Sequence, residues 1–284
     1  MSKKIAIVTD STGCIPQQVA AEYGIDISHI MIIFKDQAYQ EFKEISPEKF
    51  VELLGTQAEL PSTSQPSPGL TVELYEEILG RGFDHIIHIT ISSKLSGTYQ
   101  SAVNCAEMVD ASKITVFDSL SVAFPQGALA IEAAKMVRNG ASVEEILSQL
   151  EELRKTTHVS AAILKLDNLK KGGRLSNAQA ALGSLLNIKP IIQVQPEGNV
   201  EAIDKVRTFK KAIAALAAQV KDAKLDESYE IGVLHIENEE DAKKLMEEVA
   251  AVYPNNKIHL LPLSLVLSVH TGPGAVAMTW IKTL

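Results

Sequence analysis

Short apolar runs alternate with amphipathic stretches over the first half of the chain. The runs at residues 5–8, 27–33, 85–91 and 113–117 are rich in β-branched side chains and predict strands. The stretches between them predict helices. Because strands that alternate with helices form parallel sheets, we expect an α/β domain whose parallel sheet is covered by helices.

The pattern changes after an amphipathic helix that is predicted for residues 143–155. Two apolar runs flank the turn at residues 196–199 and predict a hairpin. The elements expected after it are a helix at 210–220, a strand at 231–236, a helix at 238–252 and a strand at 258–263. This order predicts a smaller, mixed α+β second domain.

We place the α/β domain at residues 1–156 and the mixed domain at residues 157–271. The apolar stretch at 260–269 is expected to be a buried strand and turn. A C-terminal helix within 272–284 is expected to pack back on the first domain. No repeat or low-complexity linker separates the two parts, so we expect domains in close contact.

Composition and charge exclude several classes of protein. Hydrophobic residues make up 46% of the 284 residues and charged residues 22%, which is typical of a folded chain. The net charge of -8 leaves no electrostatic footprint for nucleic acid. The N-terminal apolar run is too short for a signal peptide, and residues 260–269 are too few to span a membrane. We therefore expect a cytoplasmic protein.

A hydroxyl-rich turn at residues 92–101 lies between a predicted strand and a predicted helix. Free N–H groups at a helix start favour an anion, and Ser96 and Thr98 add hydroxyl donors. The alternative is that Ser96 only caps the helix. Similar turns at residues 9–13, 61–69 and 118–119 are expected to reach the same carboxyl edge of the sheet, where open α/β sheets bind ligands.

His270 stands in a glycine-rich turn that is predicted to precede the last helix. A lone histidine is commonly a structural hydrogen-bonding residue, but this position suits a donor to an anion. The pattern G-x-G-x-x-A at 272–277 lacks a surrounding βαβ unit, so we reject a dinucleotide site. Cys14 and Cys105 match no metal spacing, and no metal site or catalytic motif is indicated.

A cationic, glycine-containing loop at residues 166–176 stands out in this acidic chain. It carries Lys171 and Arg174 and precedes a helix predicted for 177–186. The loop is either a solvated turn, a phosphate contact or a docking point for an acidic or nucleotide-bearing partner.

Six segments together resemble the DegV family, and the resemblance covers essentially the whole chain. They are residues 9–13, 63–69, 93–102, 118–119, 169–175 and 272–277. The resemblance implies two α/β-type domains with one long-chain fatty acid in a tunnel between them. It also implies a non-enzymatic protein that presents the acid to a bacterial fatty acid kinase, which forms an acyl phosphate for phospholipid synthesis. The bound acid would be the only ligand, with no cofactor.

The family's functional positions can be assigned to this chain. The resemblance implies that the side chains of Thr63, Ser96 and His270 and the backbone N–H of Gly97 hold the carboxylate. It also implies that Arg174 works with the kinase. Lys171 lies on the same loop and is a second candidate for that contact. Candidates for a secondary pocket are Ser64, Thr98 and Ser119.

Two segments depart from the family pattern. The chain has Asp36-Gln37 where the family usually has Asp-Gly, which changes a surface turn. It has residues 123–127, AFPQG, where the family has small residues and Gly-Gln-Gly. The second change alters the predicted pocket beside Ser119, and with it the preference for chain length or unsaturation.

Two other functions compete with the carrier role. One is an esterase or acyltransferase with Ser96 as nucleophile and His270 as base, which requires contact between the two side chains. The other is an adaptor that binds lipid and reports to a regulatory partner. The carrier role further predicts transient membrane contact for lipid exchange, without a transmembrane segment.

Overall fold

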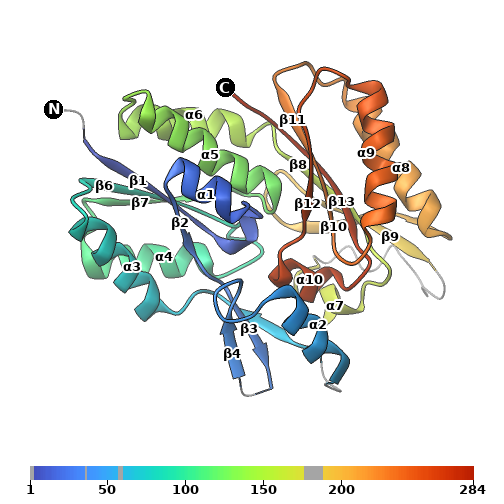
Figure 1. The fold of residues 1–284 in the computed structure, drawn as a ribbon, viewed down its shortest axis with the longest axis horizontal. Helices are drawn as coiled ribbons and strands as arrows, with labels where there is room; N and C mark the ends of the chain where they lie inside the picture. The colour runs from blue at the N-terminus through green and yellow to red at the C-terminus, as the bar shows by residue number, and fades with distance from the viewer. Residues whose placement is uncertain (1–2, 36, 57–59, 176–187) are drawn as a thin grey trace.

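The computed structural model describes residues 3–35, 37–56, 60–175 and 188–284, and its first half is a parallel sheet (Figure 1). The strand order is β2-β1-β6-β7. The bounds are Ile5–Asp10 for β1, Ile25–Ser28 for β2, His85–Thr90 for β6 and Ile114–Asp118 for β7. All three strand pairs are parallel, as predicted.

Helices cover both faces of this sheet (Figure 1). On one side lie α1 (Gln17–Tyr23), α5 (Phe124–Arg138) and α6 (Val143–Arg154), and on the other α3 (Pro68–Gly80) and α4 (Thr98–Val109). Alternation along β1 explains this, because Ile5 and Ile7 join one hydrophobic core and Ala6 and Val8 join another. The predicted α/β architecture is therefore confirmed.

A small antiparallel sheet of order β4-β3-β5 lies beside the parallel one, next to α2 (Pro47–Thr56) (Figure 1). Its strands are β3 (Met31–Phe34), β4 (Gln37–Gln40) and β5 (Ser62–Ser64). The prediction of one strand over 27–33 is wrong. The chain leaves the parallel sheet after Ser28, where the backbone N–H of Ile30 donates to Ser11 Oγ (3.1 Å).

The second half is a six-stranded sheet of order β10-β9-β8-β13-β11-β12. Its strands are β8 (His158–Ala162), β9 (Lys189–Val194), β10 (Val200–Val206), β11 (Tyr229–His235), β12 (Ile258–Pro262) and β13 (Val276–Lys282). Only β11 and β12 run parallel in it. Helices α8 (Phe209–Ala223) and α9 (Glu239–Val252) cover its outer face (Figure 1). The mixed α+β prediction and the β9–β10 hairpin are confirmed.

The predicted C-terminal helix within 272–284 is wrong. The segment is strand β13, which lies in the middle of the second sheet between β8 and β11. Every residue from Val276 to Ile281 is buried, so both faces of the segment are covered, as in a central strand. The segment nevertheless returns to the first half, since β13 packs against α5 and α6 and Leu284 N donates to Glu132 on α5 (3.1 Å).

The stretch at 260–269, predicted as a strand and turn, contains the end of β12 and the start of α10 (Leu265–Thr271). Ser264 caps this helix, since its Oγ accepts from Leu267 N at 3.4 Å. His270 therefore lies in the last turn of a helix, and the prediction of a turn before a helix is wrong. The short helix α7 (Asp167–Lys171) packs beside α10. The helix predicted at 177–186 lies outside the described residues.

One hydrophobic core reaches across both halves of the molecule. It includes Ile7 and Leu129 on the first half and Leu234 and Leu263 on the second. Among the residues that the structure describes, no helix has the length and apolar character that crossing a membrane requires. The two sheets therefore pack against a single shared hydrophobic core.

Candidate ligand-binding site

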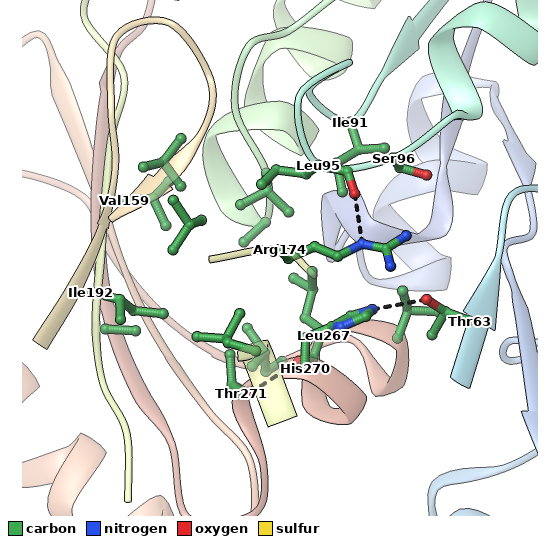
Figure 2. A pocket seen from close by; sticks show the side chains of 18 of the residues that line it. Thr63, Ile91, Leu95, Ser96, Val159, Arg174, Ile192, Leu267, His270 and Thr271 are labelled. Carbon is green, nitrogen blue, oxygen red and sulfur yellow. Dashed lines mark hydrogen bonds between the residues drawn. The ribbon is translucent and has the colours of Figure 1, made fainter. Parts of the chain in front are cut away.

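A cavity lies between the two sheets and takes its walls from both halves of the chain (Figure 2). Most of its lining is aliphatic. The aliphatic residues of the first half are Ile30, Ile91, Leu95, Val122 and Ala123, and those of the second include Val159, Ala161, Ile192, Val194, Val200, Leu263, Val266, Ala275 and Ala277. Such a lining suits a hydrocarbon chain.

Polar side chains gather at one end of the cavity (Figure 2). Thr63 on β5 and His270 on α10 meet there, with 2.8 Å between Thr63 Oγ1 and His270 Nε2. Ser96, from the turn between β6 and α4, and Gln65 also line the cavity. Residues that are far apart in the sequence therefore form one polar end, and Val159 and Ile192 lie at the opposite, apolar end (Figure 2).

Arg174 also reaches into this end of the cavity. Its Nε donates to the carbonyl of Leu95 (3.0 Å) and its Nη1 to the carbonyl of Gly172 (2.5 Å). The guanidinium therefore connects the second half of the chain to the β6–α4 turn of the first half.

His270 is a neutral imidazole at neutral pH. Burial and, to a smaller extent, the nearby Arg174 charge lower its pKa to about 4. Its Nδ1 is buried and has no hydrogen-bond partner among the described residues. The Nδ1 atom faces Gly172, where an added Cβ would lie 2.7 Å from it. A residue larger than glycine at position 172 would displace the ring.

Gly97 is the N-cap of α4, so it opens a helix that points its free N–H groups toward the turn. Ser96 Oγ lies 2.9 Å from Thr98 Oγ1 and accepts from Thr98 N at 3.3 Å. The expectation that Ser96 caps the helix is wrong, because the N-cap is Gly97 and no side chain caps α4. Ser96 makes a local contact with Thr98 and lines the cavity.

Some predicted site residues do not converge on the cavity. Ser64 lines it, but Thr98 and Ser119 do not. Ser119 is fully buried, and its hydroxyl bonds the backbone of Ser121. The turn at 9–13 is also occupied, since Asp10 accepts from Ile91 N (2.7 Å) and from Thr12 N (3.1 Å). These groups support the edge of the sheet and are not ligand donors in this arrangement.

A groove of about 200 Å³ lies on the other side of the polar residues. Thr63, Arg174 and His270 line both the groove and the inner cavity. Lys171, which is exposed, and Asn168 also line the groove. A group bound by Thr63 and His270 would therefore be within reach of the surface.

The space enclosed by the described walls of the cavity is about 100 Å³. Cavities of roughly 150 Å³ hold a benzene molecule. A long acyl chain is much larger than benzene, so we expect the walls to move apart when one binds.

No sequence pattern pointed to Glu41, which is fully buried beside α10. Its Oε1 accepts from Ser264 Oγ (2.7 Å) and from Val266 N (3.1 Å). Burial raises the pKa of this carboxyl to about 7. Because no motif surrounds Glu41 and its partners lie more than 200 positions away, only the fold could reveal this contact.

Two chemical alternatives lack the geometry that they require. Ser96 bonds Thr98, and His270 bonds Thr63, so the nucleophile–base pair of an esterase is not assembled. Within the described ranges, no group of three or more His, Cys, Asp or Glu side chains could hold a metal ion.

A model of the DegV family, described as uncharacterised protein, matches residues 4–283. The protein DegV of Bacillus subtilis is 38% identical over 278 residues, which cover 97% of this chain and 98% of that one. A crystal structure of DegV from Bacillus subtilis, described as a fatty acid binding protein, has a TM-score of 0.90, with 99% of this chain and 100% of that chain covered at 38% identity. A fatty-acid-binding DegV family protein from Thermus thermophilus has a TM-score of 0.89 at 33% identity and covers 98% of this chain and 99% of its own.

Proposed function

This chain belongs to the DegV family, and on that premise we propose that it binds one long-chain fatty acid in the cavity between its two sheets. The observation that carries the proposal is an aliphatic cavity with a single polar end, where Thr63 and His270 are hydrogen-bonded. Solved relatives described as fatty acid binding proteins support it.

The hydroxyls of Thr63 and Ser96 and the N–H of Gly97 donate to the carboxylate, and the His270 imidazole orients the Thr63 hydroxyl toward it. We assign the His270 proton to Nε2, so that the ring donates to Thr63 Oγ1 and the Thr63 hydroxyl donates its own hydrogen to the carboxylate. The other tautomer would bury an N–H at Nδ1, which has no acceptor among the described residues. Neutral donors therefore bind the head group.

The acyl tail supplies most of the affinity. Burial of a methylene contributes about 0.8 kcal/mol, so the methylenes of a palmitoyl tail together contribute about 11 kcal/mol, several times as much as any one hydrogen bond at the head. The polar end then fixes the direction of the chain, with the carboxylate near the groove and the tail toward Val159 on β8.

We propose further that the protein is a carrier that presents the carboxylate to a fatty acid kinase, which converts it to an acyl phosphate for phospholipid synthesis. The support is the groove at the polar end, because it would give a partner access to the bound carboxylate. Lys171 and Arg174 line this groove and are the proposed contacts for the partner. In this role the protein works in the cytoplasm, has no cofactor and performs no catalysis of its own.

The experiment is lipid extraction from the purified protein followed by mass spectrometry. Near-stoichiometric fatty acid is expected, and stringently delipidated protein should regain one equivalent when it is reloaded with palmitic or oleic acid. A bacterial fatty acid kinase with ATP should then phosphorylate the bound acid. If delipidated protein takes up no fatty acid, the binding proposal is wrong; if it binds acid that no kinase phosphorylates, the adaptor role replaces the carrier role.

A further inference from the structure

A second cavity, of about 300 Å³, lies on the same inner face of the second sheet. Helices α1 and α5 form one of its sides, and β11 and β12 form the other. The carrier function described above makes no use of it. The pairing register of β8, β13, β11 and β12 shows where this cavity lies relative to the first one.

Two rows of paired residues run from one cavity to the other across β8, β13, β11 and β12. The first row is Ala161, Ala277, Leu234 and Leu261, and the second is Val159, Thr279, Gly232 and His259. Ala161, Ala277 and Val159 line the first cavity. Leu261 and His259 line the second cavity. The two cavities are therefore neighbours on one sheet surface, separated only by the middle of each row.

The ring of Phe124 covers the middle of the second row. An added Cβ at Gly232 would lie 2.5 Å from Thr279 Oγ1 and 2.8 Å from Cγ of Phe124, so these two side chains together occupy the place that a side chain at position 232 would need. The ring centroid lies 4.8 Å from that of His259. In the first row the same place is taken by Leu234, which is fully buried.

The chain itself crosses from one cavity to the other at this point. Ala123 lines the first cavity, and Phe124, the next residue, lines the second. Phe124 is also in the segment at 123–127, where the sequence departs from the family pattern. The ring of Phe124 therefore stands where the chain passes from one cavity to the other.

We infer that Phe124, seated on Gly232, is the end wall of the acyl-chain cavity and sets the longest fatty acid that the protein accepts. The inference rests on the proposed function and deepens it. Beyond the wall, Ala128, Ile131 and Leu261 give the second cavity an apolar side. Among its charged groups, Glu132 pairs with Lys135 (2.6 Å) and Glu230 with Lys257 (3.4 Å), and Glu22 also lines it. Without the ring, an acyl tail would continue along this apolar side.

The test measures the affinities of delipidated protein for lauric, myristic, palmitic, stearic, arachidic and behenic acids by displacement of a fluorescent fatty acid. In the wild type, affinity should rise about fourfold per added methylene until the tail reaches Phe124, and then level off or fall. In Phe124→Ala and Phe124→Leu the rise should continue to longer acids. Ala277→Val, which narrows the first cavity, should shift the optimum to shorter acids.

The matched control is Ile131→Ala, which enlarges the second cavity without opening the wall. It should keep the wild-type profile. If Phe124→Ala does not fold, Phe124→Leu and Ala277→Val still decide the question. The inference is wrong if the wild type binds fatty acids but the Phe124 variants keep its optimum, or if Ile131→Ala shifts the optimum equally. A wild type that binds no acid at all contradicts the proposed function instead.

Discussion

Thr63 and His270 are two neutral side chains that contact each other at the polar end of the cavity. Most of the other described residues that line the cavity are aliphatic. Because burial keeps the pKa of His270 at about 4, its imidazole carries no charge at neutral pH. An anion at this place is held by hydrogen bonds rather than by an ion pair with the ring. The hydroxyl of Thr63 is then the group whose removal tests the site most directly.

Replacement of Thr63 by valine keeps the shape of the side chain and removes the hydroxyl. A hydrogen bond to a charged group contributes about 1.5–3 kcal/mol, so the affinity for palmitic acid should fall about tenfold to a hundredfold. The affinity for hexadecanol, which has no carboxylate, should fall much less. Isothermal titration with both ligands measures the difference.

Ser119→Ala is the matched control for this experiment, because Ser119 is a buried hydroxyl that bonds the Ser121 backbone away from the cavity. Its affinity for palmitic acid should equal that of the wild type. An equal loss in Thr63→Val and Ser119→Ala would show that the loss reflects general destabilisation. The carboxylate contact would then be assigned wrongly.

The sequence pointed to Thr63, Ser96 and His270 because hydroxyls and a histidine stand in turns after predicted strands and match the family pattern. It could not point to Gln65 or Glu41. Their significance depends on distant segments that pack against them, and no local spacing records such packing. Lining residues and buried partners are therefore the part of a site that requires the fold.

Helix α10 carries His270 at one end and is held at the other end by Glu41. Val266, Leu267 and Thr271 of the same helix line the cavity. A carboxyl from the first half of the chain thus fixes an element of the second half that forms the binding wall. The ionisation of Glu41 should therefore affect the stability of this arrangement.

We expect Glu41→Gln to stabilise the protein above pH 7. The pKa of Glu41 is raised from 4.5 to about 7 by burial, so the folded state loses stability as pH rises from 4.5 through 7. At ~1.4 kcal/mol per pH unit the loss reaches about 3 kcal/mol, and glutamine, which does not ionise, avoids it. Urea unfolding at pH 5 and pH 8 measures the free energy of unfolding of both proteins. The advantage of Glu41→Gln over the wild type should be larger at pH 8 than at pH 5 by about this amount.

Glu52→Gln serves as the control, since Glu52 is an exposed glutamate on α2. The difference in free energy of unfolding between this variant and the wild type should be the same at pH 5 and pH 8. A constant difference for Glu41→Gln as well would mean that Glu41 ionises normally in the folded protein.

Element predictions succeeded where burial is periodic and failed where tertiary packing covers both faces. The parallel strands were predicted because their β-branched runs alternate with amphipathic helices. Residues 276–282 contain the run VAMTWI, which is apolar at five of its six positions and fits a helix or a strand equally. Only its place between β8 and β11 decides for a strand.

The molecule as a whole encloses its ligand cavity between two halves that share one core. Arg174 contributes a hydrogen bond between them, since its Nε donates to Leu95 in the β6–α4 turn (3.0 Å). The enclosed space of about 100 Å³ is too small for a long acyl chain. We therefore expect the walls to separate when an acyl chain is loaded. This separation breaks the hydrogen bond between Arg174 and Leu95.

A protein that must open before it binds should show a rate limit. When delipidated protein is mixed with a fluorescent fatty acid in a stopped-flow instrument, the observed binding rate should level off as the concentration of the acid increases, because opening becomes rate-limiting. Arg174→Ala removes the contact with Leu95 and should raise the plateau about tenfold if ~1.4 kcal/mol of the barrier is lost.

Arg138→Ala is the matched control, because Arg138 donates to the carbonyl of Glu22 and lies over the Tyr23 ring within the first half. Its plateau should equal that of the wild type. A wild-type rate that increases linearly with concentration would mean that the acid enters without a separation of the two halves.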